Sequence, residues 1–163
     1  MHIIIKNKFL ILDDYRVKCA IGKRGIKIKK REGDLITPKG TYNLSKLLYR
    51  KDRVKNLKSR LKKIIIKKNM GWCDDPKSKD YNKLIKIPFK HSYEKLHIKK
   101  NIYDIILVLN YNMQPVKKDK GSAIFIHIAK KNFNSTKGCV AIRKKELRVI
   151  LKMVNARTKV KII

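Results

Sequence analysis

Short apolar runs rich in β-branched residues recur along the whole chain, each ended by charged or turn-forming residues. Their length and their isoleucine and valine content favour strands over helices. A chain divided in this way is restricted to a mainly β fold, either a sandwich or a barrel-like sheet. The runs are HIIIK, FLIL, RVKCAIG, TYNLSKLLYR, KKIIIKK, LIKIPF, YDIILVLN, AIFIHI, CVAI and KVKII.

Two segments have a helical pattern instead. Residues 144–155, KKELRVILKMVN, place four apolar side chains between Leu147 and Val154 at helical spacing. Residues 92–100, SYEKLHIKK, are a shorter and weaker candidate. Since 163 residues with 43% hydrophobic content can bury one core, we expect a single mainly β domain over residues 1–163 with one or two helices.

The charge of the chain is extreme. Lysine and arginine number 44 against 12 acidic residues, a formal net charge of +32, and the basic residues are spread along the whole length. One interpretation is a surface adapted to nucleic acid, anionic lipid or another polyanion, without catalysis. The other is compositional drift, because lysine, isoleucine and asparagine all follow from an AT-rich genome. Aromatic residues are few and scattered, which argues against a base-stacking platform.

Several classes of protein find no support in the sequence. The three cysteines, Cys19, Cys73 and Cys139, lie far apart without a C-x-x-C pair, so neither a zinc site nor a disulfide framework is indicated. Lys6 and Lys8 interrupt the apolar N-terminal segment, which predicts a β-hairpin rather than a signal peptide. No stretch approaches the roughly 18 apolar residues of a membrane span.

The segment IFIHIAKKNFNSTKGCVAI, residues 124–142, combines groups that suit nucleophilic catalysis. Alternation along the first run places His127 on the same face as Phe125, and a loop then leads to Cys139. A histidine can accept the thiol proton and return it to a leaving amine. Gly138 permits a sharp turn, so that the amides of Gly138 and Cys139 would stabilise an oxyanion. The alternative is a buried structural cysteine beside a core histidine.

Charges near this turn favour the catalytic interpretation. Lys137, Arg143 and the start of the predicted helix would surround Cys139 with positive potential, which predicts a lowered thiol pKa.

The same segment resembles the catalytic signature of the YkuD-type L,D-transpeptidases, in which a histidine at a strand end precedes a [Ser/Thr]-x-Gly-Cys turn. Residues 136–139, TKGC, match that turn. The earlier stretch KREGDLITPKGTY resembles the family's Thr-Pro-x-Gly segment, and GWCDDPKSKDYN resembles a branch of single-domain bacterial members. Two positions depart from the common pattern: Lys137 stands where many members have histidine, and Ala141 where they have arginine, although Arg143 would supply a cation nearby.

The resemblance implies acyl transfer on peptidoglycan stem peptides. Cys139 would attack the amide before the terminal D-alanine, His127 would act as base and then acid, and Thr136 would support the turn or the substrate. An amine would then accept the acyl group, or water would hydrolyse it. The resemblance implies no metal or cofactor. It also implies a periplasmic or cell-envelope location, whereas the absence of a recognisable signal leaves the cytoplasm as the alternative.

Two loops supply further candidate binding residues. In REGDLITPKG, Glu32 and Asp34 would either bind an ammonium group of the acceptor or pair with nearby lysines. In GWCDDPKSKDYN, Trp72 and Tyr81 would either wall a groove for a glycan or peptide or pack in the interior.

Overall fold

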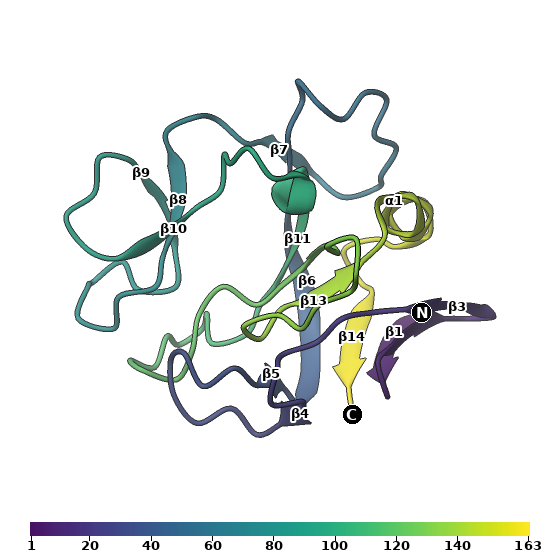
Figure 1. The fold of residues 1–163 in the computed structure, drawn as a ribbon, viewed down its shortest axis with the longest axis horizontal. Coiled ribbons are helices and arrows are strands. Elements are labelled where there is room, and N and C mark those ends of the chain that lie inside the picture. Colours follow the sequence, from purple (N-terminus) through teal and green to yellow (C-terminus); the bar gives the residue numbers. More distant parts are fainter.

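The computed structural model describes residues 1–163, and its architecture is mainly β with one α-helix. Figure 1 shows a strongly curved sheet with the helix at one end and a smaller sheet to one side. The elements are β1 (His2–Lys6), β2 (Phe9–Leu12), β3 (Tyr15–Lys18), β4 (Ile26–Lys27), β5 (Thr37–Pro38), β6 (Gly40–Tyr49), β7 (Lys63–Ile65), β8 (Met70–Cys73), β9 (Leu84–Lys86), β10 (Tyr93–Lys95), the 3-10 turn η1 (Asn101–Tyr103), β11 (Ile105–Leu109), β12 (Phe125–Ile128), β13 (Val140–Ile142), α1 (Lys144–Met153) and β14 (Lys159–Ile162).

The main sheet has the strand order β13-β12-β11-β6-β14-β1-β2-β3, with β7 paired to β6. The long strand β6 organises it, because its first half pairs with β14 and its second half with β11. Beyond β3, Ala20 exchanges two backbone hydrogen bonds with Ala141 of β13, at 2.8 and 2.9 Å. These bonds join the two edges of the sheet, so the fold is a nearly closed barrel, which confirms the predicted mainly β class.

The period of two in the strand sequences explains the core. In β1, Ile3 and Ile5 are fully buried while their neighbours are more exposed. Their side chains join a cluster of 25 buried residues inside the barrel. The strands β11 and β12 are buried on both faces, which explains their continuous apolar sequences.

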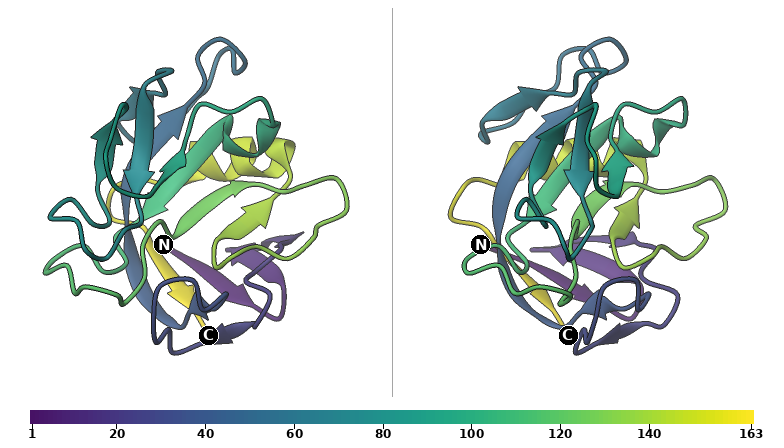
Figure 2. Two further views of the ribbon diagram at one scale, coloured as in Figure 1. Left: turned by 60° about the vertical axis from the view of Figure 1, so that its left-hand side comes forward. Right: turned by 90° about the vertical axis from the view of Figure 1, so that its left-hand side faces the viewer.

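The outer face of β11 and β12 belongs to a second cluster of ten buried residues. The three-stranded sheet β10-β8-β9 contributes to this cluster, and Trp72 of β8 meets Phe125 of β12 edge to face at 5.3 Å. Figure 2 shows the small sheet beside the β11–β12 part of the barrel. Its position places a wall opposite the strand that carries His127.

One of the two expected helices is present. The prediction for residues 144–155 is confirmed by α1, which buries Leu147, Ile150 and Leu151 against the barrel. The prediction for residues 92–100 is wrong: that segment forms β10, and the short turn η1 follows it. The pairing of Tyr93 with Cys73 and of Lys95 with Gly71 gives this segment a strand partner that its own sequence does not reveal.

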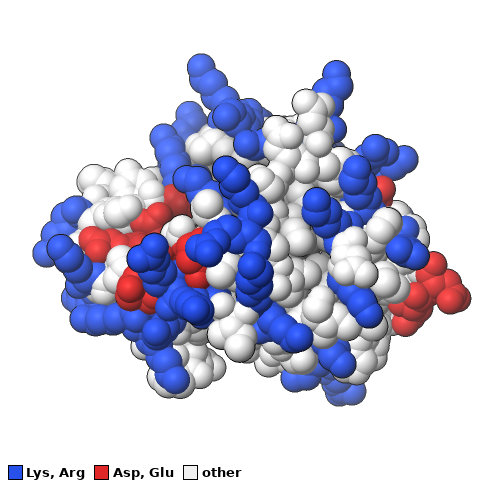
Figure 3. Space-filling model, turned by 60° about the horizontal axis from the view of Figure 1, so that its bottom comes forward, with Lys and Arg blue, Asp and Glu red and all other residues white.

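Lysine and arginine side chains are spread over the face drawn in Figure 3, whereas acidic side chains gather mainly on its left, with a second group at the right edge. No helix of the protein has the length and apolar character needed to cross a membrane.

Candidate active site

A cleft of about 600 Å³ lies between the outer face of β12 and β13, the small sheet and the loops before β5 and β12. Both residues of the predicted catalytic pair line it. Its walls include Lys29, Glu32, Asp74, Glu94, Ile102, Tyr103, Ser122, Ala123, His127, Lys130, Thr136, Lys137, Gly138, Cys139 and Ala141.

The parallel pairing of β12 with β13 explains why the histidine and the cysteine share this cleft. His127 lies directly opposite Ala141, and Cys139 precedes Ala141 by two positions. Residues opposite each other in a sheet, and residues two apart in one strand, point to the same face. The imidazole and the thiol therefore project from neighbouring rows of one surface.

The His127 ring is buried and held in one orientation. Its Nδ1 lies 3.0 Å from the carbonyl oxygen of Ile128, and the edge of the ring meets the Tyr103 ring with 5.2 Å between centroids. Burial lowers the pKa of His127 to about 4, against the opposing effect of the Ile128 and Ile102 carbonyls. The ring is therefore neutral at pH 7, and an Nδ1–H donated to Ile128 leaves Nε2 as the unprotonated nitrogen.

The Cys139 thiol is partly exposed to the cleft, and its Sγ donates to the carbonyl oxygen of Ala123 at 3.1 Å. Burial, together with the charge of Glu94, raises the pKa of Cys139 to about 12, against the opposing effects of the Phe125 amide and Lys29. The prediction that surrounding lysines lower this pKa is wrong. The reason is that burial of the thiol dominates, and Lys29 is the only basic side chain whose charge opposes the rise.

The high thiol pKa predicts how Cys139 reacts with an alkylating reagent. Only the thiolate is nucleophilic, so its alkylation rate should rise about tenfold per pH unit from pH 7 to 10 instead of levelling off near a normal thiol pKa of about 8.5. Cys19 and Cys73 are almost fully buried and should react only after unfolding. Mass spectrometry of iodoacetamide-treated protein measures each site, and a rate for Cys139 that is already constant above pH 9 would contradict the shift.

The turn before Cys139 is fixed by the Thr136 side chain. Its hydroxyl accepts from the Gly138 amide at 3.1 Å and donates to the Cys139 carbonyl at 2.6 Å. The Gly138 N–H is therefore already paired, and the prediction that it is an oxyanion donor is wrong for this conformation. The amides of Cys139 and Lys137, two residues that line the cleft, have no hydrogen-bond partner in the protein.

Gly138 is required by its backbone conformation and its surroundings. Its φ is +142°, and a Cβ at this position would lie 2.9 Å from the Ile36 carbonyl oxygen. Gly138→Ala should displace the turn, lower turnover at least about tenfold and cost about 1–3 kcal/mol of unfolding free energy. Urea denaturation and an activity assay measure both effects. Gly33→Ala is the control for stability, since a Cβ there meets no atom within 4 Å although its φ of +71° is also positive.

Thr37 connects the turn to the first long loop. Its hydroxyl donates to the Gly138 carbonyl at 2.9 Å and accepts from the Gly22 amide at 2.8 Å. In the sequence this threonine is recognisable only as part of the stretch that resembles the family's Thr-Pro-x-Gly segment. Its partners lie 15 and 101 residues away, a distance along the chain at which no local pattern gives a signal.

The two cations expected near the substrate differ in position. Lys137 is exposed and lines the cleft. Arg143 does not: it lies at the start of α1, with its guanidinium 5.4 Å from the Phe133 ring centre. The prediction that Arg143 binds substrate is therefore wrong for this conformation, whereas Lys130, which the sequence did not single out, lines the cleft.

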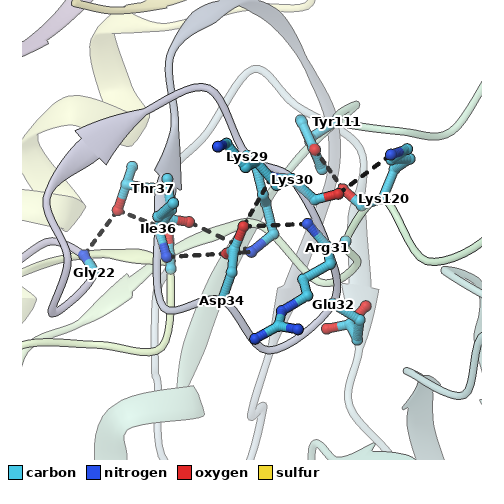
Figure 4. A network of polar contacts seen from close by, with 12 residues as sticks. Gly22, Lys29, Lys30, Arg31, Glu32, Asp34, Ile36, Thr37, Tyr111 and Lys120 are labelled. Carbon is cyan, nitrogen blue, oxygen red and sulfur yellow. Dashed lines mark hydrogen bonds and ion pairs between the residues drawn. The ribbon is translucent and has the colours of Figure 1, made fainter.

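The Asp34 carboxylate is held by hydrogen bonds from residues of its own loop (Figure 4). One carboxylate oxygen accepts from Lys29 Nζ at 2.5 Å, and both oxygens accept backbone amides, those of Lys30, Arg31 and Ile36. Burial raises the pKa of Asp34, but these hydrogen bonds outweigh it and lower the pKa to about 2. Of the two alternatives for Asp34, the structure supports pairing with a lysine and not binding of an acceptor.

Glu32 differs from Asp34 because its carboxylate faces the cleft. The Glu32 carboxylate accepts a hydrogen bond from the Tyr81 hydroxyl at 2.5 Å. The Tyr81 hydroxyl oxygen in turn accepts a hydrogen bond from the Gly121 amide at 2.9 Å. The ammonium-binding role predicted for Glu32 stays a prediction.

Trp72 and Tyr81 are interior residues, each 1% exposed. The indole Nε1 donates to Asn82 Oδ1 at 3.0 Å, and neither aromatic side chain lines the cleft. Their predicted role as walls of a groove is wrong, and the packing alternative is correct.

Sequence patterns missed Tyr103, Glu94 and Ser122, all of which line the cleft. The Tyr103 hydroxyl donates to Glu94 while its ring contacts His127. The sequence predicted a helix at Glu94, and it gave no site role to Tyr103, which begins the run YDIILVLN, or to Ser122. The only sequence signal for Ser122 is its place directly before the β12 run.

Taken together, the fold and the site define a barrel-like β domain with a neutral thiol and a buried imidazole in one cleft. A family model described as the L,D-transpeptidase catalytic domain, YkuD, matches residues 3–162. The chain therefore belongs to the YkuD family, whose members are cysteine-dependent enzymes that act on peptidoglycan peptides and are typical of the cell envelope. No curated protein matches the chain.

Proposed function

We propose that this protein is a cysteine acyltransferase that acts on peptidoglycan stem tetrapeptides, releasing D-alanine and transferring the remaining acyl group to an amine. The observation that carries the proposal is the common face of Cys139 and His127 in one cleft, beside an unpaired Cys139 amide. Family membership supports the same reaction class.

Acylation begins with both groups neutral. The Cys139 thiol turns from the Ala123 carbonyl towards His127 and transfers its proton to Nε2 while the sulfur attacks the carbonyl carbon. This coupling is needed because a thiol with a pKa of about 12 supplies almost no thiolate at pH 7. The free amides of Cys139 and Lys137 donate hydrogen bonds to the developing oxyanion.

The intermediate then collapses, the carbon–nitrogen bond breaks, and His127 returns the proton to the leaving D-alanine amine. A thioester on Cys139 remains. An acceptor amine attacks it, gives up a proton to His127, and displaces the thiolate, which is reprotonated. Water in place of the amine gives hydrolysis, the L,D-carboxypeptidase variant of the same site. Atoms and charge balance in each step with the peptides and these two side chains alone.

The carboxylate of the leaving D-alanine needs a cation. Lys137 and Lys130 are the candidates, because both line the cleft and neither has an acidic hydrogen-bond partner. In this proposal Lys137 takes the place of the histidine that many family members carry in the turn. We further propose a location at the cell envelope, where this substrate occurs.

A direct assay tests the proposal. Incubation with a disaccharide-tetrapeptide should release D-alanine, and mass spectrometry should detect a cross-linked dimer if an amine accepts the acyl group or a tripeptide if water does. Release of no D-alanine from this donor, with protein shown to be folded by circular dichroism, would contradict the proposal.

The charge of +32 supports a second property, association with anionic polymers such as nucleic acid. A salt titration separates this property from substrate binding. Affinity for duplex DNA should fall steeply as salt rises, if the contacts are those of unspecific surface lysines. Saturable DNA binding that survives about 150 mM salt would instead favour a dedicated polyanion-binding protein.

A further inference from the structure

A second hollow, of about 350 Å³, lies between α1 and the loop that joins β6 to β7, and it shares no residue with the cleft of Cys139. Figure 1 shows this loop beside α1. Four of the six residues that line the hollow are basic and none is acidic: Asn56, Lys58, Lys145, Arg148, Val149 and Lys152. A lining of this composition attracts an anion.

The helix supplies three of the four cations from one of its sides. Lys145, Arg148 and Lys152 are separated by three and four residues, the spacing of neighbours along one side of an α-helix. Seven residues at about 1.5 Å per residue extend this row over about 10 Å. The buried side of α1 packs into the barrel core. The row therefore faces outwards, and its length suits an extended ligand better than a single compact ion.

The loop on the other side of the hollow is fixed both to the helix and to the core. The Arg148 guanidinium donates to the Lys55 carbonyl oxygen at 3.1 and 3.2 Å and to the Asn56 carbonyl oxygen at 3.2 Å. Val54 and Leu57 of the loop are buried in the same apolar cluster as the inner side of α1. The hollow is thus preformed, and a ligand that enters it does not have to order the backbone.

The cations of the hollow are not neutralised within the protein. Neither its three lysines nor Arg148 forms an ion pair. Arg53 of the same loop and Lys144 of the same helix do form ion pairs, because both contact Asp104. Four like charges around one hollow repel each other, so an anion bound among them removes part of that repulsion. The site gains most from a ligand that carries several negative charges.

The lining suits phosphate groups but neither bases nor lipid tails. Lysine and arginine side chains are the common partners of phosphate oxygens. No aromatic side chain lines the hollow, so it offers no surface for a base to stack on. Its one apolar residue, Val149, is 37% exposed and is too small a surface to hold an acyl chain. An extended ligand with repeated charges, recognised through its phosphates alone, is a phosphodiester polymer.

We propose that the hollow between α1 and the β6–β7 loop binds the backbone of a phosphodiester polymer, with its three lysines and Arg148 in contact with the phosphates. The site is separate from the cleft and goes beyond the proposed acyl transfer. It also differs from the unspecific attraction that a charge of +32 exerts over the whole surface, because it holds the polymer at one place.

Two polymers test the site by fluorescence anisotropy at about 50 mM salt: an oligothymidylate of about twelve nucleotides and a base-free deoxyribose phosphate polymer of the same length. Their affinities should agree within about threefold. Lys145→Gln combined with Lys152→Gln should lower both affinities at least about tenfold. It should also reduce the slope of log affinity against log salt by about 1.4, since each lost phosphate contact on a single strand contributes about 0.7.

Lys67→Gln combined with Lys68→Gln is the matched control, because it removes the same charge from exposed lysines between β7 and β8, outside the hollow. It should lower the affinities less than about threefold. Losses as large as those of the Lys145 and Lys152 variant would overturn the site and assign binding to the overall charge. A preference for oligothymidylate beyond threefold would overturn recognition through phosphates alone, and absence of saturable binding to both polymers would overturn the proposal. None of these outcomes depends on D-alanine release.

Discussion

Replacement of Cys139 by serine should lower D-alanine release by about 10³-fold or more while leaving the fold intact. A serine hydroxyl is far less acidic than a thiol, and His127, whose pKa is about 4, is too weak a base to compensate. The serine Oγ retains the hydrogen bond to the Ala123 carbonyl, so the unfolding free energy should change by no more than about 1 kcal/mol. Chromatographic detection of D-alanine and urea denaturation measure the two quantities.

Cys73→Ala is the matched control for this experiment. Cys73 is fully buried in β8 and does not line the cleft, so its loss should affect stability more than turnover. A thioester on Cys139, seen by mass spectrometry as an acylated tryptic peptide, should form in the Cys73→Ala protein and be absent in the Cys139→Ser protein. Activity of Cys139→Ser within tenfold of the parent protein would exclude this sulfur as the nucleophile.

The sequence predicts the strands better than the loops, for a reason visible in the core. Strands such as β1 alternate between buried and more exposed residues, and β11 and β12 are apolar throughout because they are buried on both faces. Both patterns are local and can be recognised in the printed sequence. Residues 92–100 have neither pattern, and their strand forms because β8 provides a partner.

The candidate site also has a part that the sequence predicts and a part that it does not. Cys139 and His127 belong to one continuous segment, so a local motif identifies the pair, and the parallel pairing of β12 with β13 brings them to one face. Glu94, Tyr103 and Ser122 come from three separate segments and meet only through the fold. The sequence also could not predict that the pKa of the Cys139 thiol is raised. The direction of this shift depends on burial of the sulfur and not on the number of lysines nearby.

Substitution of His127 by asparagine should lower kcat/KM by about 10²–10⁴-fold. The asparagine amide can still donate to the Ile128 carbonyl, as Nδ1 does, but it offers no basic nitrogen in place of Nε2. The thiol pKa of about 12 makes this loss severe, since no thiolate is available to react without a base. Alkylation of Cys139 at pH 10 or above, where hydroxide deprotonates the thiol, should by contrast remain similar in the two proteins.

The pH dependence distinguishes a base from a merely structural histidine. Since burial lowers the pKa of His127 to about 4, kcat/KM of the parent protein should stay constant as pH falls from 7 to 5 and decline near pH 4. The unfolded chain has a histidine pKa near 6.5 and binds the proton more readily than the native state between pH 6.5 and 4. His127 therefore makes stability decrease as pH falls through this window, and His127→Asn should reduce that slope in urea denaturation. Retention of the kinetic decline near pH 4 in the asparagine variant would assign it to another group and remove His127 from the role of base.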